Sequence, residues 1–271
     1  MVETIYIARH GFRLNWVTSN WKSETGIPRD PPLAAFGLTQ AQELADHFLS
    51  LPLEERPTAI LSSPYYRCLQ TAKPVAVALG VPIYVEHGLS EWYSPVVPGT
   101  GLHPRPPSAT ALRAWFPEID DTWSSIWYPS RKGEDVEEVH DRANGYLSAL
   151  VPEIERRFPA EHKKILLVTH AATAIALTRE LVGDRALAMR VGCCTLTELS
   201  RPSDRANVVG EWIVQRLADG SHLKDGSQRD WGFEDIVIAN GKVVQDPGSV
   251  GTENDLEQPV GLQATSVNSR L

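Results

Sequence analysis

Two histidines occupy matching positions in this sequence, each directly after a short apolar run. His10 follows residues 5–8, and His170 follows residues 166–169. Such runs are typical of buried strands, and open α/β sheets bind their ligands beyond the carboxyl ends of the strands. We therefore expect the two imidazoles to face the same ligand.

Arginines near the two histidines indicate what that ligand is. Arg9 and Arg13 flank His10, and Arg67 lies in the first turn of the helix expected after Ser62-Ser63-Pro64. Three guanidinium groups would repel a divalent cation, but they bind the oxygens of a phosphate through paired hydrogen bonds. We therefore interpret the histidines as groups that handle a phosphoryl group, and we predict neither a metal ion nor a cofactor.

These residue types favour covalent catalysis of phosphate ester hydrolysis. A neutral imidazole such as that of His10 can attack phosphorus and form a phosphohistidine, which divides the reaction into two easier steps. His170 and the arginines would stabilise the transferred group. The leaving oxygen needs a proton, for which Glu91 after the third expected strand is the candidate donor. Its neighbour Trp92 and a closing loop would raise the Glu91 pKa toward the range of a general acid.

Other titratable residues leave alternatives open. Glu86 and Glu134 compete with Glu91 for the role of proton donor, because most glutamates are simply exposed and only one is needed here. Cys68 stands next to Arg67. The sequence lacks the Cys-x5-Arg loop of the cysteine phosphatases, so we interpret Cys68 as a packing residue.

Taken together, these motifs resemble the histidine phosphatase superfamily, also called the phosphoglycerate mutase-like family. The resemblance covers about residues 3–200 and rests on Arg9-His10-Gly11 with Arg13, Arg67 after Ser-Pro, Glu91, and Thr169-His170-Ala171. Smaller features agree, namely Pro32-Leu33, Gly37, Gln40-Ala41, and Gly133-Glu134 with Arg142. The family pattern implies His10 as nucleophile, Glu91 as proton donor, and Arg9, Arg13, Arg67 and His170 around the phosphate.

Three stretches look like narrower groups within this family. Residues 8–16, 63–68 and 91–93 are similar to the phosphatase domain of a fungal transcription factor IIIC subunit and to that of the ubiquitin-associated and SH3-containing proteins. Mutases of the family usually have Glu and Ser where this chain has Phe12-Arg13, which disfavours a mutase. The resemblance implies a phosphomonoesterase acting on a phosphorylated small molecule or a phosphopeptide, with phosphotyrosine as one candidate. Its alternative is a phosphatase-like interaction module among transcription factor IIIC subunits.

The elements that must position these residues alternate between strands and helices. We expect strands at residues 4–8, 58–61, 81–85, 165–168, 195–199 and 212–215, and helices at 38–51, 65–79, 171–182 and from 136 to about 152, where Pro152 should kink or end the helix. This alternation predicts an α/β fold, in which helices flank a mainly parallel sheet.

The chain divides into one predicted domain and a tail. Residues 1–245 would form the phosphatase-like domain. Within it, about residues 86–132 are rich in proline and aromatic residues, which predicts an ordered insertion over the active site because so many aromatic side chains need burial. Residues 246–271 are rich in Gly, Ser, Asn, Gln and Pro, so we expect a disordered tail.

Composition limits the partners and the compartment. The formal net charge of −8 argues against direct binding of nucleic acid or of an acidic membrane. An odd number of cysteines (Cys68, Cys193 and Cys194) is not a disulfide framework and favours a reducing compartment. We find neither a signal peptide nor an apolar run of the ~18 residues that a membrane span needs. We therefore expect a cytoplasmic or nuclear protein that is not secreted.

Overall fold

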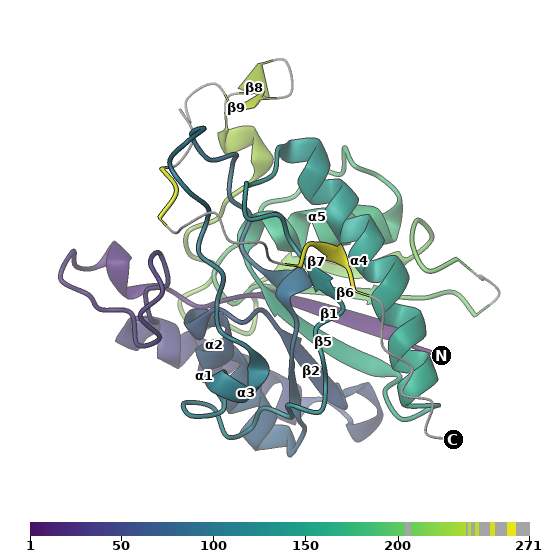
Figure 1. The fold of residues 1–271 in the computed structure, drawn as a ribbon. Helices are drawn as coiled ribbons and strands as arrows, with labels where there is room; N and C mark the ends of the chain where they lie inside the picture. The colour runs from purple at the N-terminus through teal and green to yellow at the C-terminus, as the bar shows by residue number, and fades with distance from the viewer. Residues whose placement is uncertain (204–206, 237, 240–241, 244–249, 253–258, 264–271) are drawn as a thin grey trace, which may run out of the picture.

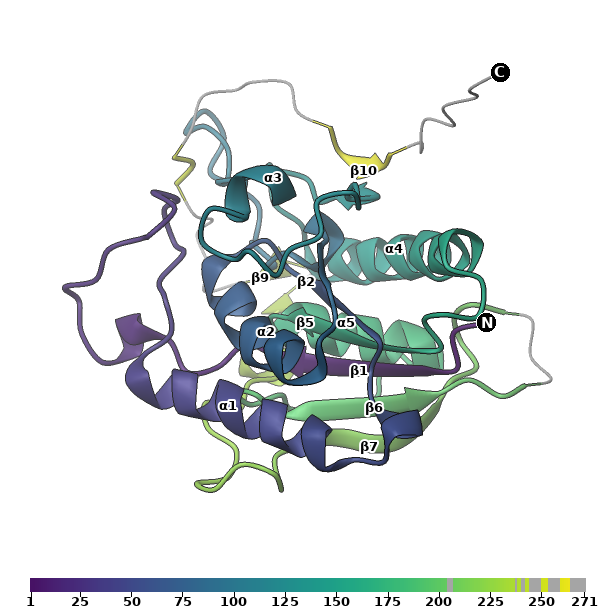
Figure 2. The same cartoon turned by 90° about the horizontal axis from the view of Figure 1, so that it is seen from below.

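A six-stranded sheet forms the centre of the molecule. The computed structural model describes residues 1–203, 207–236, 238–239, 242–243, 250–252 and 259–263. The sheet contains β1 (Thr4–Arg9), β2 (Ala59–Ser62), β3 (Ile83–Val85), β5 (Lys164–Thr169), β6 (Leu196–Ser200) and β7 (Ile213–Asp219), in the order β3-β2-β5-β1-β6-β7 (Figure 2). The first four are parallel, whereas β6 pairs antiparallel with β1 and β7 antiparallel with β6. The predicted α/β fold with a mainly parallel sheet is confirmed.

Helices cover both faces of this sheet (Figure 1). The helices are α1 (Ala35–Ser50) and α2 (Tyr66–Leu79) on one face, and α4 (Val136–Arg157) and α5 (Ala171–Val182) on the other. Side chains of β1 alternate between the two layers, since Tyr6 and Ala8 pack with α1 and α2 while Ile5 and Ile7 pack with α4 and α5. Burial on both faces explains why residues 5–8 of this strand form an uninterrupted apolar run.

Helix α4 corrects one prediction. The expectation was that Pro152 kinks or ends this helix; the helix continues through Pro152 as far as Arg157, so the second alternative is wrong. Val151 and Ile154, on either side of the proline, are buried in the core, and their packing offsets the lost backbone hydrogen bond. Within the described residues, no helix combines the length and apolarity that crossing a membrane requires.

The aromatic-rich segment of residues 86–132 packs against the sheet and contains short elements of its own. It contains α3 (Ala109–Leu112) and β4 (Trp127–Tyr128), and Ile119 extends the sheet by bridging to Ile83. Phe116 and Trp123 are only 2% exposed, which satisfies the predicted need for burial, although Trp115 is 38% exposed. Short 3-10 turns occupy Leu14–Trp16, Leu53–Glu55, His87–Leu89 and Phe233–Asp235.

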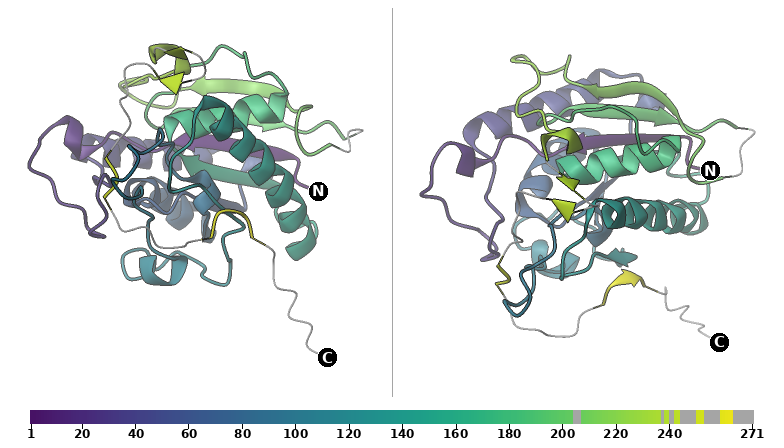
Figure 3. Two further views of the ribbon diagram at one scale, coloured as in Figure 1. Left: turned by 45° about the horizontal axis from the view of Figure 1, so that its top comes forward. Right: turned by 90° about the horizontal axis from the view of Figure 1, so that it is seen from above.

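Part of the predicted tail pairs with this insertion. β10 (Gly261–Leu262) lies antiparallel to β4 (Figure 3), and Thr252 donates a backbone hydrogen bond to Leu102. These residues form backbone hydrogen bonds although their composition predicts disorder, because backbone pairing at an exposed strand edge needs no apolar side chain. Residues 246–249, 253–258 and 264–271 of that tail lie outside the described residues. β8 (Ile238–Ala239) pairs antiparallel with β9 (Lys242–Val243).

Candidate active site

His10 lies directly after β1, in a backbone held by close packing. Its amide donates to the carbonyl of Thr169, which joins the two strand ends. A Cβ atom on Gly11 would come within 2.7 Å of the Gly37 carbonyl oxygen, and one on Gly37 within 2.2 Å of the Phe12 carbonyl oxygen. The two glycines therefore allow the loop after His10 to pack against the first turn of α1.

A single hydrogen bond sets which nitrogen of His10 can react. Nδ1 of His10 lies 2.8 Å from the carbonyl oxygen of Gly11. A carbonyl oxygen only accepts hydrogen bonds, so Nδ1 carries the hydrogen and Nε2 keeps its lone pair. Burial, together with the positive charges of Arg67 and other neighbours, holds the pKa of His10 well below its ordinary value. The imidazole is therefore neutral at pH 7 and suited to nucleophilic attack.

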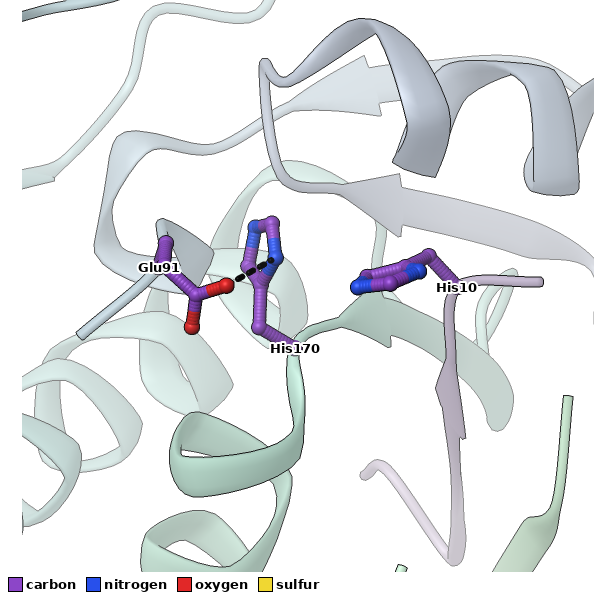
Figure 4. Close-up of side chains that lie close together, drawn as sticks. All are labelled: His10, Glu91 and His170. Carbon is purple, nitrogen blue, oxygen red and sulfur yellow. Dashed lines mark ion pairs between the residues drawn. The ribbon is translucent and has the colours of Figure 1, made fainter. Parts of the chain in front are cut away.

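His170 caps the start of α5 and faces His10. The two ring centroids are 5.3 Å apart, and Figure 4 shows His170 between His10 and Glu91. Nε2 of His170 lies 2.8 Å from the hydroxyl oxygen of Ser63, and Nδ1 lies 3.1 Å from Nη2 of Arg67. Burial lowers the pKa of His170 to about 4, although the nearby Glu91 carboxylate opposes this shift.

Arg67 is the central cation of the site and is 1% exposed. Its Nη1 lies 3.1 Å from Oδ1 of Asp30, and its Nη2 lies 3.2 Å from Oε2 of Glu91. Asp30 is fully buried and also accepts from the backbone amide of Tyr66. Two carboxylates therefore compensate the buried charge, one on each side of the guanidinium group.

Glu91 lies beside His170 but has a different charge state from the one expected. Its Oε2 is 3.3 Å from Nδ1 of His170. Burial alone would raise the pKa of Glu91, but His170, Arg67 and Arg13 together hold it well below its ordinary value. The prediction of a raised pKa is thus wrong for the site without substrate, because the sequence showed the aromatic neighbour and not the guanidinium contact. Glu91 is ionised here.

Three hydrogen bonds fix the backbone that carries Glu91. Nη1 of Arg142 donates to the carbonyl oxygens of Gly88 and Ser90, at 2.8 and 3.2 Å. The hydroxyl of Thr173, in the first turn of α5, also donates to Ser90 at 2.8 Å. The helix that begins after His170 therefore also positions the segment leading to Glu91.

The two alternative proton donors have other partners. Glu86 accepts from the indole of Trp123 at 2.6 Å and from the amide of Ile126 at 2.9 Å. Glu134 accepts from Nε of Arg142 at 2.8 and 3.0 Å. Both carboxylates hold the insertion and the Glu91 segment in place, and of the three glutamates Glu91 is the one in contact with His170 and Arg67.

Arg9 and Arg13 complete the positive charge around His10. Nη1 of Arg9 donates to the carbonyl oxygens of Val191 and Arg229, and Cζ of Arg13 lies 4.2 Å from the ring centroid of Trp16. Burial, and the charge of Arg67, lower the pKa of Arg13 to about 10, at which it stays protonated at pH 7. The Nε atoms of Arg9, Arg13 and Arg67 are buried without a hydrogen-bond partner among the described residues. An anion with several oxygens fits these donors.

The same cluster has the residue types of a metal site. Ligand atoms of His10, Glu91 and His170 all lie within 4.8 Å of one another. However, Nη2 of Arg67 contacts the two atoms of this set that would bind an ion most directly, Nδ1 of His170 and Oε2 of Glu91. A guanidinium group in that place repels a cation, so the donor set fits a phosphate better than a metal.

Cys68 is close to these groups but is not activated. Its sulfur lies 3.5 Å from Nε2 of His170. Burial raises the pKa of the Cys68 thiol, although the charge of Arg67 opposes this shift. A thiol that stays protonated is a poor nucleophile, which agrees with the interpretation of Cys68 as a packing residue.

Sequence reasoning found the strand-end residues and missed three others. Asp30, Trp16 and Arg229 all lie near the arginines, in loops without a periodic pattern. The one available signal was that Asp30 stands in a Pro-rich loop, directly before Pro31-Pro32. A buried counter-ion for Arg67 was also to be expected from the cost of burying a charge alone.

Comparison with known proteins agrees with this geometry. The model of the histidine phosphatase superfamily (branch 1) matches residues 5–212. The transcription factor tau 55 kDa subunit of Saccharomyces cerevisiae is 33% identical over 267 residues, which cover 88% of this chain and 60% of that relative's length. A probable phosphoglycerate mutase of Proteus mirabilis is 26% identical, covering 82% of this chain and 95% of the relative. The ecdysone phosphate phosphatase of Bombyx mori, solved in complex with tungstate, has the same fold, with a TM-score of 0.63 and 18% identity over 87% of this chain and all of that one. The chain belongs to the histidine phosphatase superfamily.

Proposed function

We propose that this chain is a phosphomonoesterase that works through a phosphohistidine at His10 and needs no metal ion. The observation that carries the proposal is the state of His10, a buried neutral imidazole with the lone pair of Nε2 available. Around it lie Arg67, Arg9 and Arg13, which supply donors for the three non-bridging oxygens of a phosphoryl group.

In the first step, Nε2 of His10 attacks phosphorus and the bond to the ester oxygen breaks. Nδ1 keeps its hydrogen and goes on donating it to the Gly11 carbonyl oxygen, which stabilises the positive ring that forms. Glu91 gives a proton to the leaving oxygen, so the alcohol departs neutral. This requires that Glu91 becomes protonated when substrate binds, which follows if the phosphate draws Arg67 away from it and adds negative charge nearby.

In the second step, water attacks the phosphohistidine. The Glu91 carboxylate accepts one proton from that water, the N–P bond breaks, and phosphate leaves with His10 neutral again. His170, which neighbours both His10 and Glu91, stabilises the transferred group in both steps and can take a positive charge once the phosphate dianion is present.

The substrate proposed is a phosphorylated small molecule or a phosphopeptide, with phosphotyrosine as the first candidate, and the compartment proposed is the cytoplasm or nucleus. The resemblance of residues 63–68 and 91–93 to phosphatase domains of ubiquitin-associated and SH3-containing proteins supports this choice. One such human protein is 29% identical over 179 residues.

The test compares the wild type with His10→Ala and with His47→Ala, a control on α1 outside the site. A panel of phosphoesters gives the activities, and rapid quenching with a ³²P-labelled substrate gives the intermediate. The wild type and His47→Ala should form an acid-labile, alkali-stable phosphoprotein, and His10→Ala should form none. Normal turnover by His10→Ala would overturn the proposal.

A second candidate function is that of a phosphatase-like subunit of transcription factor IIIC. The 33% identity to the yeast tau 55 kDa subunit supports it, over about 60% of that protein's length. Affinity purification of the tagged chain from its own cells, followed by mass spectrometry, tests this candidate. Recovery of other transcription factor IIIC subunits in stoichiometric amounts would support it, and their absence would count against it.

A further inference from the structure

A fourth arginine reaches the site from a distant part of the chain. Arg229 lies in the loop after β7, and its Cζ atom is 5.2 Å from the ring centroid of Trp16 and 5.5 Å from that of Phe12. The ring of Trp16 in turn lies 6.3 Å from the ring of His10. We propose that Arg229 and Trp16 form a subsite for a second anionic group of the substrate, a carboxylate or another phosphate. This inference rests on the proposed function and adds the substrate class.

The loop that carries Arg229 is tied to the phosphate-binding residues. The carbonyl oxygen of Arg229 accepts from Nη1 of Arg9 at 2.6 Å. On either side, Gln228 accepts from the amide of Cys193 at 2.8 Å, and Trp231 bridges to Val191. These bonds hold the loop at the edge of the site, so the position of the Arg229 side chain is set by the same framework that orients Arg9.

The backbone of Arg229 is in the left-handed region. Its φ angle is 57°, a conformation that is unfavourable for residues with a Cβ atom. Residues held in such conformations cluster at ligand sites, where the surrounding structure enforces them. Here the flanking hydrogen bonds of the loop enforce it, and the result is a guanidinium group placed over the Phe12–Trp16 pair.

In the part of the chain that the structure describes, the charge of Arg229 has no counter-ion. Among the described residues, no carboxylate forms a salt bridge with it, and its neighbour Asp230 binds the hydroxyl of Ser227 instead. Arg190, which is also near this loop, has both Glu234 and Asp235 as partners. Arg229 therefore differs from Arg190, whose charge two neighbouring carboxylates compensate.

Three guanidinium groups gather around one indole. Cζ of Arg13 lies 4.2 Å, that of Arg229 5.2 Å and that of Arg9 5.7 Å from the ring centroid of Trp16. The indole face attracts each cation, but the three cations repel one another. One phosphoryl group at His10 engages Arg9 and Arg13, which leaves Arg229 for a second anion on the part of the substrate that extends past Trp16.

The experiment pairs two esters that differ by one carboxylate. The probes are 4-nitrophenyl phosphate and 3-carboxy-4-nitrophenyl phosphate, and the measured quantity is the ratio of their kcat/KM values. The variants are Arg229→Gly, which suits the positive φ and removes only the side chain, and Arg229→Lys, which keeps the charge. Arg156→Ala, at the distant end of α4, controls for the loss of one surface arginine.

We expect the wild type to prefer the carboxylated ester, and Arg229→Gly to reduce that preference by roughly tenfold, the size of one charge-assisted hydrogen bond. Arg229→Lys should recover part of it, and Arg156→Ala should leave it unchanged. An unchanged ratio in Arg229→Gly, or an equal fall in Arg156→Ala, would overturn the inference.

A binding measurement separates this inference from the proposed function. Calorimetric titration with phenylphosphonate and 4-carboxyphenylphosphonate requires no turnover. The proposed function fails while the subsite stands under three conditions. The wild type prefers the carboxylated phosphonate, Arg229→Gly loses that preference, and the wild type hydrolyses neither ester. If the wild type hydrolyses both esters but neither measurement depends on Arg229, the subsite fails while the proposed function stands. Failure of the wild type to bind either phosphonate would also overturn the subsite.

Discussion

The buried carboxyl group of Glu86 should make the stability of the fold depend on pH, and this dependence can be measured directly. Glu86 is fully buried at the end of β3 and accepts hydrogen bonds from Trp123, Ser125 and Ile126. Burial raises the pKa of Glu86 from 4.5 to about 7 despite these donors. Such a pKa would also suit a general acid, so the measurement bears on the choice of Glu91 as well.

The expected change in the free energy of unfolding follows from the shift in the pKa of Glu86. The folded protein keeps a proton on Glu86 at pH values where the unfolded chain has released it, so the free energy of unfolding falls as the pH rises from about 4.5 to about 7. At ~1.36 kcal/mol per pKa unit, the loss across that window is about 3 kcal/mol. Above the folded pKa the curve should level off, because both states are then ionised.

The variant that isolates this contribution is Glu86→Gln. Its amide oxygen can still accept from Trp123 and Ile126, and its NH2 group can donate to Ser125, whose hydroxyl can turn to the carbonyl oxygen of Trp127 at 3.4 Å. The variant cannot titrate, so its stability relative to the wild type should rise by about 3 kcal/mol between pH 4.5 and 8.

Urea unfolding at a series of pH values measures this difference, and subtraction of the two curves removes every other titrating group. Glu54→Gln, at an exposed position, is the control and should show no such change with pH. A constant difference between wild type and Glu86→Gln would refute the assignment of the raised pKa. Loss of hydrolysis in Glu86→Gln, with stability intact, would instead make Glu86 the proton donor.

Three further outcomes follow from the site. Glu91→Gln should reduce hydrolysis of alkyl phosphates by roughly 10²- to 10⁴-fold but spare 4-nitrophenyl phosphate, whose leaving group needs no proton; equal losses in steady-state assays would contradict the role of Glu91 as an acid. Activity should survive dialysis against a chelator, and its loss with recovery on added zinc or magnesium would contradict metal independence. Asp30→Asn removes one partner of buried Arg67 and should cost about 3 kcal/mol or more of stability. Added phosphate should restore the melting temperature of Asp30→Asn by more than it raises that of the wild type, and an equal rise in both would contradict the role of Asp30 as counter-ion.

The helices and strands were predictable from the sequence where a single local rule decides where they begin or end. Helix α5 begins at Ala171 and ends before Gly183, whose φ of 81° is the left-handed cap that glycine favours. The local rule fails at Pro152, because burial of α4 against the sheet outweighs the missing hydrogen bond. It fails again at β10, because the edge of β4 pairs with any backbone of suitable conformation and composition carries no signal of that pairing.

The residues of the candidate site also divide into those that the sequence predicts and those that it does not. His10 and His170 were predictable because parallel strands bring their carboxyl ends to one edge of the sheet, however far apart they lie in the sequence. Asp30 and Arg229 contact the same cluster from loops, where position depends on tertiary packing rather than on a repeating pattern. The charge state of Glu91 was mispredicted for a related reason, since its pKa is lowered by His170 and Arg67, contacts that the sequence does not display.

The lowered pKa of Glu91 affects how the site would respond to substrate. Without substrate, Arg67 pairs with both Asp30 and Glu91, so the two carboxylates occupy the guanidinium that a phosphate requires. An incoming phosphate dianion competes with Glu91, which is 19% exposed and can move, rather than with the fully buried Asp30. Displacement of Glu91 from Arg67 removes one of the interactions that keep its pKa low and leaves it beside a dianion, which favours protonation. In the proposed mechanism, binding of the phosphate and formation of the general acid are therefore one event, since Glu91 would become an acid only when there is a phosphate to cleave.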